Sequence, residues 1–254
     1  MRLIDSHCHL TDEAFDNDRL FILNDLSNFG LRGIINPATN LTDSKMAIEL
    51  AEKYDNFYAM AGIHPEEVDK ITDKDLEELE NLAQNEKVIA IGEIGLDYYW
   101  KDDNKDRQKE IFIHQLELAR KLKKPAVIHV RDSKDDVIEI LKDYQDLKIQ
   151  IHCFSDDLET LEKYMEMGFF ISIGGVVTFN NGTNEQNAAR NVPIERLMLE
   201  TDSPYLTPEP YRGLRNDPRR VVEVARTVAD LRDMKIDKLA KKTYNNTKEF
   251  FNLW

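Results

Sequence analysis

Short apolar runs alternate with longer amphipathic segments along the whole chain. Eight of these runs are rich in β-branched or other apolar residues and have the length of buried strands: 3–8, 33–37, 57–62, 88–94, 126–130, 148–153, 169–174 and 197–201. Helical patterns occur near residues 16–29, 43–55, 74–85, 105–123, 134–144, 157–167, 217–231 and 236–251. Between the last two strands there is only a weak helical pattern, at 185–191.

Residues that end helices support these bounds. Thr72 or Asp73 is suited to cap the third helix, and Gly30 and Gly168 stand where helices would end. Dividing 254 residues among eight strand–helix units gives about 32 residues each, the size of a (β/α)8 TIM barrel unit. We therefore predict an α/β fold of this type, as one domain over residues 1–254. A doubly wound open sheet is the alternative, although no GxGxxG or P-loop motif favours it.

Composition narrows the class of protein. The chain has 34 Lys and Arg against 48 Asp and Glu, a net charge of −14, and 41% hydrophobic residues, which is typical of a soluble globular protein. Its most apolar stretch, 168–179, is too short to cross a bilayer, so we expect that the chain does not span a membrane. Two cysteines and the lack of a signal peptide indicate the cytoplasm. The acidic balance argues against a basic nucleic-acid-binding surface, but not against nucleic acid as an enzyme substrate.

The positions of the histidines give the main functional signal. Of the 6 histidines, all but His114 fall at or near the carboxyl end of a predicted strand. In a barrel, active sites are built at that end of the strands. The clustered residues are His7, His9, His64, His129 and His152.

The first strand brings Asp5, His7 and His9 to one face, because strand side chains alternate. Two inward imidazoles at a strand end favour a metal site, with Asp5 placed to orient one of the rings. Two ordinary hydrogen-bonded histidines are the alternative. Cys8 points away, and we expect it to pack rather than to bind a metal.

The middle strands end in further donors. Glu93 follows an apolar run, so its carboxylate needs a partner: one or two metal ions, or a buried Arg or Lys. His129 and His152 would add a second pair of nitrogen donors. Arg131 would project on the same side as His129, to bind an anionic substrate group or to form a surface salt bridge.

The last strand and two loops complete the candidates. Asp202 would face the centre as metal ligand, general base or both, unless it caps a turn. His64 would contact substrate or phosphate, or cap local structure. The loop 205–220 carries four Arg against two acids near the usual phosphate site of barrels, or is simply solvated. The aromatic residues at 98–100 could stack on a base or cover the barrel mouth.

Taken in order along nearly the whole chain, these motifs resemble the TatD family of metal-dependent hydrolases. The family consists of amidohydrolase-like TIM barrels, and several members are DNases, including 3′→5′ exonucleases on single-stranded DNA or RNA. The matching motifs are Asp5-x-His7-x-His9, Gly62-Ile63-His64-Pro65, Gly92-Glu93-Ile94-Gly95-Leu96-Asp97, His129-x-Arg131, His152-Cys153-Phe154-Ser155, Glu200-Thr201-Asp202-Ser203-Pro204-Tyr205-Leu206 and Arg212-Gly213 with Arg215-Asn216 and Pro218.

The resemblance implies two divalent metal ions with a shared carboxylate. The first would be held by His7, His9, Glu93 and Asp202, and the second by Glu93, His129 and His152. Histidine ligands favour Zn, Mn or Co, whereas the family often uses Mg. One departure is Asp156, where family members commonly have Gly; it adds negative charge near the mouth or begins the next helix as a cap.

The predicted reaction is metal-dependent hydrolysis of phosphodiesters in single-stranded DNA or RNA. The metals would activate a water that Asp202 orients or deprotonates, with Glu93 bridging, while Arg131 and His64 neutralise the phosphate. The same centre acting on a small amide, ester, lactone or aminoacyl ester is the alternative. A non-catalytic nucleic-acid-binding or scaffold protein is a third, against which stand the acidic balance and the absence of a basic aromatic platform.

Overall fold

The structure is a computed structural model that describes residues 1–253. Within them, eight parallel strands form one sheet in which each strand neighbours the next in chain order. The strands are β1 Leu3–Asp5, β2 Leu31–Asn36, β3 Phe57–Ala61, β4 Val88–Asp97, β5 Ala126–Arg131, β6 Ile149–Ile151, β7 Phe170–Ile173 and β8 Leu197–Leu199. The predicted (β/α)8 barrel is therefore confirmed, and the alternative of a doubly wound open sheet is wrong.

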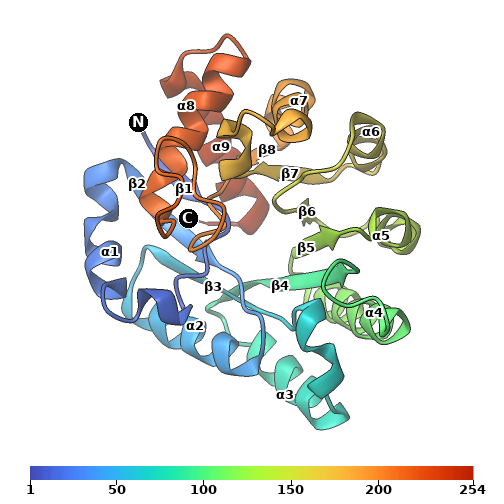
Figure 1. The fold of residues 1–254 in the computed structure, drawn as a ribbon. Coiled ribbons are helices and arrows are strands. Elements are labelled where there is room, and N and C mark those ends of the chain that lie inside the picture. Colours follow the sequence, from blue (N-terminus) through green and yellow to red (C-terminus); the bar gives the residue numbers. More distant parts are fainter. Residues whose placement is uncertain (254) are drawn as a thin grey trace.

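Helices surround the strands (Figure 1). They are α1 Arg19–Asp25, α2 Leu41–Lys53, α3 Asp73–Ala83, α4 Lys105–Leu122, α5 Lys134–Leu141, α6 Leu158–Glu166, α7 Thr183–Asn191, α8 Val221–Leu231 and α9 Ile236–Phe251. The weak seventh pattern does form a helix, α7; its buried side chains Ala188 and Ala189 are too small to give a strong periodic signal. None of the helices in residues 1–253 combines the length and hydrophobicity of a membrane span.

The predicted helix caps agree with the structure. Thr72 and Asp75 form a capping box at the start of α3, in which each side chain satisfies a backbone donor. Gly30 and Gly168 adopt the left-handed conformation, at φ 80° and 86°, where the helical segments before them end.

The barrel closes between its first and last strands. Beyond β1, the Ser6 amide donates to the Leu199 carbonyl at 3.0 Å, and Cys8 and Ser203 form a parallel bridge. The buried carboxylate of Asp5 accepts from the amides of His7 and Thr201 and from the Thr201 hydroxyl, at 3.2, 2.9 and 2.5 Å. Asp5 therefore joins the two chain segments that carry the last site residues.

The two ends of the barrel differ. At the amino ends of the strands, the Asn246 amide on α9 donates to the carbonyls of Ile194 and Leu197, at 2.7 and 2.8 Å. Phe250 and Phe251 of α9 pack against the apolar side chains of six strands, namely Ile4, Ile35, Met60, Ala90, Val127 and Met198. This end of the barrel is filled by packing, so polar chemistry is confined to the carboxyl end.

Replacing Asp5 tests the closure. Asp5→Ala would leave two buried amides and a hydroxyl without their acceptor, and we expect the free energy of unfolding to fall by about 2–4 kcal/mol. The exposed Asp55 serves as the control, because Asp55→Ala should change the free energy of unfolding by less than about 0.5 kcal/mol. Urea denaturation followed by circular dichroism measures both, and equal effects would contradict the role of Asp5.

Candidate metal centre

A cleft of about 1220 Å³ opens at the carboxyl ends of the strands. Five of the predicted ligands line it: His9, Glu93, His129, His152 and Asp202. His7 lies directly beneath, fully buried, with its ring stacked 3.9 Å from that of His152. The structure thus brings together residues at or just beyond the carboxyl ends of β1, β4, β5, β6 and β8 that are far apart in sequence.

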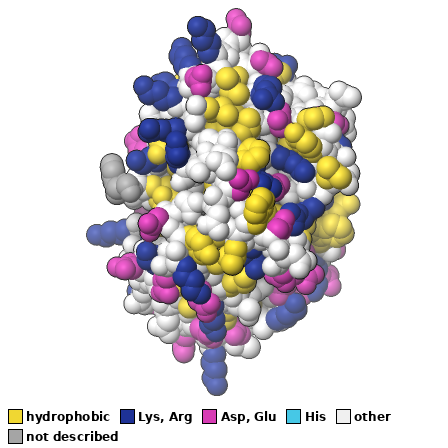
Figure 2. Space-filling view, turned by 90° about the vertical axis from the view of Figure 1, so that its left-hand side faces the viewer, with side chains coloured by type: hydrophobic (Ala, Val, Ile, Leu, Met, Phe, Trp, Pro, Cys, Tyr) yellow, Lys and Arg dark blue, Asp and Glu magenta, His cyan; other side chains and the backbone are white. Residues whose placement is uncertain are grey.

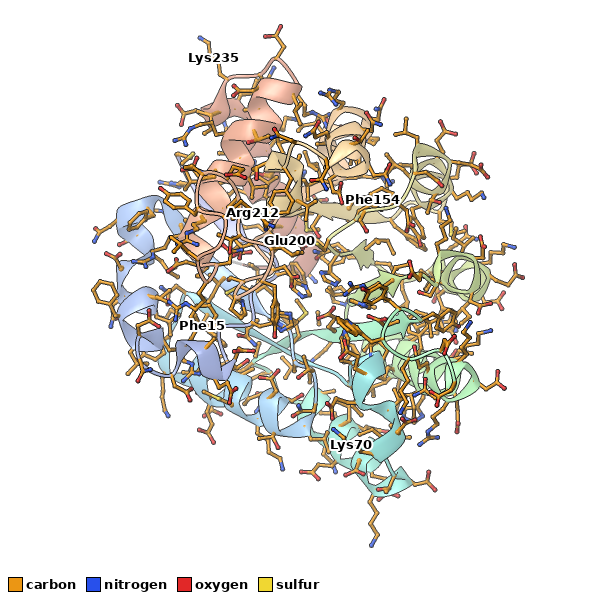
Figure 3. All side chains as sticks on the ribbon, viewed as in Figure 1. Phe15, Lys70, Phe154, Glu200, Arg212 and Lys235 are labelled. Atoms are coloured by element: carbon orange, nitrogen blue, oxygen red, sulfur yellow. The ribbon has the colours of Figure 1, made fainter. Side chains whose placement is uncertain are left out.

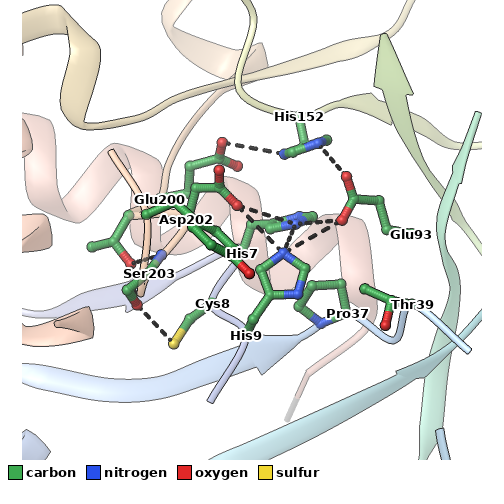
Figure 4. Close-up of polar contacts among 12 residues, drawn as sticks. His7, Cys8, His9, Pro37, Thr39, Glu93, His152, Glu200, Asp202 and Ser203 are labelled. Carbon is green, nitrogen blue, oxygen red and sulfur yellow. Dashed lines mark hydrogen bonds and ion pairs between the residues drawn. The ribbon is translucent and has the colours of Figure 1, made fainter. Parts of the chain in front are cut away.

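Glu93 contacts most members of this group, and Figure 4 shows its carboxylate directed toward His152, His7 and His9. Its Oε1 atom is 2.8 Å from His129 Nδ1 and 2.6 Å from His152 Nε2. Its Oε2 atom is 3.2 Å from His7 Nε2 and 3.4 Å from His9 Nε2. Glu93 is only 2% exposed, and its ionic partners among the described residues are imidazoles. A buried pair with Arg or Lys, one of the two alternatives for this carboxylate, is therefore wrong.

Asp202 faces the same centre from beyond β8. Its Oδ1 atom lies 3.4 Å from His9 Nε2 and 3.9 Å from His7 Nε2. Its backbone has a φ of 54°, a left-handed conformation that Asp tolerates better than most residues. Its side chain points toward His9 and His7, and it is the Asp202 carbonyl that the Tyr205 amide contacts in the following turn. The side chain is therefore directed to the centre rather than to a turn cap.

The length of β4 places His129. The expected strand ended at residue 94, but β4 continues to Asp97 and pairs Gly95 with His129 on β5. Gly95 has a φ of 145°, and a Cβ atom there would overlap the His129 carbonyl oxygen. Only glycine allows this approach of the two strands, which brings the His129 ring to Glu93.

His64 combines two of the expected roles. Its Nδ1 accepts from the Glu66 amide at 3.3 Å and so caps the short 3-10 helix Pro65–Lys70. Its Nε2 points the other way, 3.6 Å from Glu93 Oε1. Capping and a place in the centre are therefore compatible, and contact with substrate stays a prediction.

Two carboxylates behind the imidazoles received no role from the sequence. Asp97, 1% exposed, receives a contact from His129 Nε2 at 2.9 Å. Glu200, fully buried near the middle of the barrel in Figure 3, lies 3.5 Å from His152 Nδ1 and accepts from the Ser172 hydroxyl at 2.5 Å. The alternation of side chains along a strand could have identified both residues. It puts Asp97 on the same face as Glu93, and Glu200 on the same face as Asp202.

The spacing of Asp5 predicted that it would orient a histidine ring, but in the structure it does not contact one. It binds the His7 backbone amide, while the buried His7 Nδ1 has no hydrogen-bond partner among the described residues. Asp5 thus fixes the main chain of the site. Cys8 is buried as expected, and burial raises the pKa of its thiol well above the usual value.

Charges in the centre depend on one another. Burial opposes ionisation of Glu93, but the imidazoles, chiefly those of His152 and His7, hold its pKa well below its usual range. Burial also opposes a charge on His9, yet Asp202 and Glu93 raise its pKa to about 9. Without a metal the site therefore holds protons that a divalent cation would displace.

The donor set suits metal ions. Three groups of side chains bring their ligand atoms within 4.8 Å of one another: His7 with Glu93 and His152, His7 with His9 and Asp202, and His64 with Glu93 and His129. Imidazole nitrogens combined with carboxylate oxygens are ligands for Zn, Mn and Co. The groups share members, so adjacent ions would share ligands.

Two of the four arginines of the loop 205–220 pair with carboxylates, and none of the four is among the described residues that line the cleft. Arg215 forms a bidentate pair with Asp18, and Arg219 pairs with Asp217 and Asp25, all at 2.9 Å or less. Cationic and acidic side chains also alternate over the α1 side of the molecule (Figure 2). The positive charge predicted for this loop is therefore partly neutralised, and its contact with a phosphate stays a prediction.

The cleft wall itself is acidic. Among the described lining residues, Lys70 and Arg131 are the only Lys and Arg, against eight carboxylates: Asp12, Glu13, Asp43, Glu66, Glu67, Asp75, Glu93 and Asp202. Arg131 lies over the ring of Tyr99, 4.1 Å from its centroid. Asp156 lies outside the described lining, and Asp157 rather than Asp156 caps α6, accepting from the Thr160 amide at 2.9 Å.

Comparison with known proteins identifies the family. The family model described as TatD related DNase matches residues 4–252. This chain belongs to the TatD family. It is 38% identical over 253 residues to the uncharacterized metal-dependent hydrolase YabD of Bacillus subtilis, covering 99% of each chain. It is 38% identical over 258 residues to the uncharacterized metal-dependent hydrolase YcfH of Escherichia coli, covering 100% of this chain and 97% of YcfH.

A solved structure supports the same assignment. The chain is similar to YjjV, a TatD homolog from Escherichia coli, with a TM-score of 0.94 and 32% identity, over 100% of this chain and 99% of that one. The resemblance noted from the motifs is thus confirmed. The chain is a metal-dependent hydrolase of the TatD family.

Gly95→Ala tests how the centre is positioned. The added methyl group would force β4 and β5 apart at His129, and we expect the free energy of unfolding to fall by about 2–4 kcal/mol. Gly213→Ala is the control: Gly213 has a φ of 86°, but nothing lies within 4 Å of the position that its new methyl group would take. Gly213→Ala should lower the free energy of unfolding by about 1–2 kcal/mol, because alanine is strained in the left-handed backbone conformation. Urea denaturation measures both, and a smaller loss for Gly95→Ala than for the control would contradict the account.

Proposed function

We propose that this TatD-family hydrolase uses two divalent metal ions to hydrolyse phosphodiesters at the 3′ end of single-stranded DNA or RNA. The observation that carries the proposal is the placement of Glu93, whose two oxygens each face a different pair of imidazoles. A carboxylate buried in this way is suited to bridge two cations.

The proposed ligands follow from these contacts. His7, His9, Glu93 and Asp202 would hold one ion, and Glu93, His129 and His152 the other. Asp97 and Glu200 would fix the rings of His129 and His152 from behind, since a carboxylate on the far nitrogen orients a metal-binding imidazole. When bound, the ions supply an activated water and neutralise charge on the phosphate.

Asp202 is the proposed general base. The Asp202 side chain is 14% exposed and the Glu93 side chain 3%, so Asp202 is the carboxylate of the pair that water reaches more readily. Its neighbours, chiefly His9, hold its pKa below the usual range in spite of burial, so it stays ionised and able to accept a proton. As the water oxygen bonds to phosphorus, a proton of the water passes to Asp202, and the bond from phosphorus to the 3′ oxygen of the shortened chain breaks. That oxygen takes up a proton and leaves as the 3′ hydroxyl.

Substrate contacts are assigned to the open side of the cleft. Arg131 would neutralise a phosphate oxygen, and His64 Nε2 would contact the phosphate from the β3 side. The description of the family as TatD related DNase supports nucleic acid as the substrate. Single strands fit better than duplexes, because an acidic wall lines much of the cleft and repels a second phosphate backbone.

The same acidic wall favours a second candidate. An uncharged or cationic substrate, such as an aminoacyl ester or a small amide, would meet attraction where an anion meets repulsion. The ligand set does not separate the two, because metal-activated water attacks carbonyl carbon as well as phosphorus.

A gel assay separates the two functions. Protein stripped with a chelator is reloaded with Mg, Mn, Co or Zn and incubated with 5′-labelled single-stranded DNA, and in parallel with an aminoacyl ester. We expect a metal-dependent ladder that shortens from the 3′ end. Glu93→Gln and Asp202→Asn should slow it by roughly 100-fold or more.

The control is Asp55→Asn, an exposed carboxylate outside the cleft, which should leave the rate unchanged. Metal-dependent ester cleavage without any DNA or RNA cleavage would sink the nuclease proposal and establish the second candidate.

A further inference from the structure

Two exposed aromatic rings stand beside the cleft with an arginine against them. Tyr99 and Trp100 are 56% and 62% exposed and adjacent to each other, with their ring centroids 4.9 Å apart. The Arg131 guanidinium lies 4.1 Å from the Tyr99 ring centroid and 5.3 Å from that of Trp100. We call these three residues the aromatic platform. Trp100 and Arg131 both line the cleft.

The platform has a rigid base. The backbone amides of Tyr99 and Trp100 both donate to Asp97 Oδ1, at 3.0 and 3.1 Å. The fully buried Gln108 holds the loop from within, accepting from the Asp97 amide and donating to the carbonyls of Asp97 and Lys101, at 2.8 to 3.0 Å. The rings are therefore exposed on a loop that is fixed in place, which favours binding over flexibility.

The platform is also linked directly to the metal centre. The second oxygen of Asp97 contacts His129 Nε2 at 2.9 Å, while His129 Nδ1 contacts Glu93. One buried carboxylate thus fixes both the exposed loop and a candidate ligand. A group stacked on the platform would lie at a set position relative to the reacting phosphate.

We propose that the aromatic platform binds the unpaired terminal base of the nucleic acid, an inference that rests on the proposed nuclease function. Trp100 would stack on the base, since every base offers a ring face to an aromatic side chain. Arg131, held against Tyr99 by cation–π attraction, would pair with the adjacent phosphate. The sequence indicated that the aromatic residues at 98–100 could stack on a base, but not that Arg131 lies against them, because Arg131 is on β5 and the rings are in the loop after β4.

Charge explains why the base would lie on this side. Six carboxylates besides Glu93 and Asp202 line the cleft and repel phosphates: Asp12, Glu13, Asp43, Glu66, Glu67 and Asp75. The Tyr205 hydroxyl is held by Asp12 at 3.1 Å. Arg131 supplies positive charge on the platform side, so a nucleotide is guided to Trp100.

The first test compares two oligonucleotides on the metal-loaded enzyme. One ends in a 3′ thymidine, and the other ends in an abasic residue with the same phosphates. Wild type should prefer the base by about 5- to 100-fold in kcat/KM. Trp100→Leu should remove that preference while changing the rate on the abasic chain less than about twofold, and Trp100→Phe should retain most of it. An unchanged preference in Trp100→Leu would overturn the proposal.

The second test does not depend on turnover. The chain has 2 tryptophans, Trp100 and Trp254, so Trp254→Phe leaves Trp100 as the sole tryptophan reporter. In the metal-loaded protein, thymidine 5′-phosphate should quench its fluorescence saturably, whereas deoxyribose 5-phosphate should not.

The two tests distinguish the two claims. If wild type cleaves no oligonucleotide but thymidine 5′-phosphate alone quenches, the nuclease proposal fails and the base-binding site stands. If cleavage occurs and neither the quenching nor the base preference is seen, the platform proposal fails while the nuclease function stands.

Discussion

The burial of one carboxylate among imidazoles is the constraint on which the rest of the site depends. Glu93 is nearly withdrawn from water, and such a charge persists only where other groups compensate it. The carboxyl ends of five strands direct histidine or aspartate side chains toward it, from His7 beyond β1 around to Asp202 beyond β8. The closed barrel makes this convergence possible, because it places the carboxyl ends of all its strands around one axis.

Around this centre, the charge changes sign with distance. Imidazoles surround Glu93, buried Asp97 and Glu200 lie behind them, and six further carboxylates line the wall of the cleft. Arg131 interrupts that wall on the side of the aromatic platform. A net charge of −14 and an acidic cleft leave bound cations as the main source of positive charge for an anionic substrate, so metal loading and substrate binding should be coupled.

Much of this could be predicted from the sequence, for identifiable reasons. Alternating apolar runs and helical patterns gave all eight strands, and alternation put His7 beside His9. What failed depended on contacts between distant segments. The reach of β4 to Asp97 depends on the pairing of Gly95 with His129, and the arginines near 215 are neutralised by carboxylates about 200 residues earlier, such as Asp18. The pairing of Arg131 with Tyr99 likewise arises only once β4 and β5 are adjacent.

A metal titration shows whether Glu93 bridges two ions. Chelator-stripped protein would be titrated with Mn²⁺ in a calorimeter, beside Glu93→Gln and the control Glu67→Gln, a more exposed carboxylate of the cleft wall. The account predicts two ions per chain in wild type and in the control, and weakened binding of both ions in Glu93→Gln. A single ion in wild type, or two ions whose affinities Glu93→Gln leaves unchanged, would contradict it.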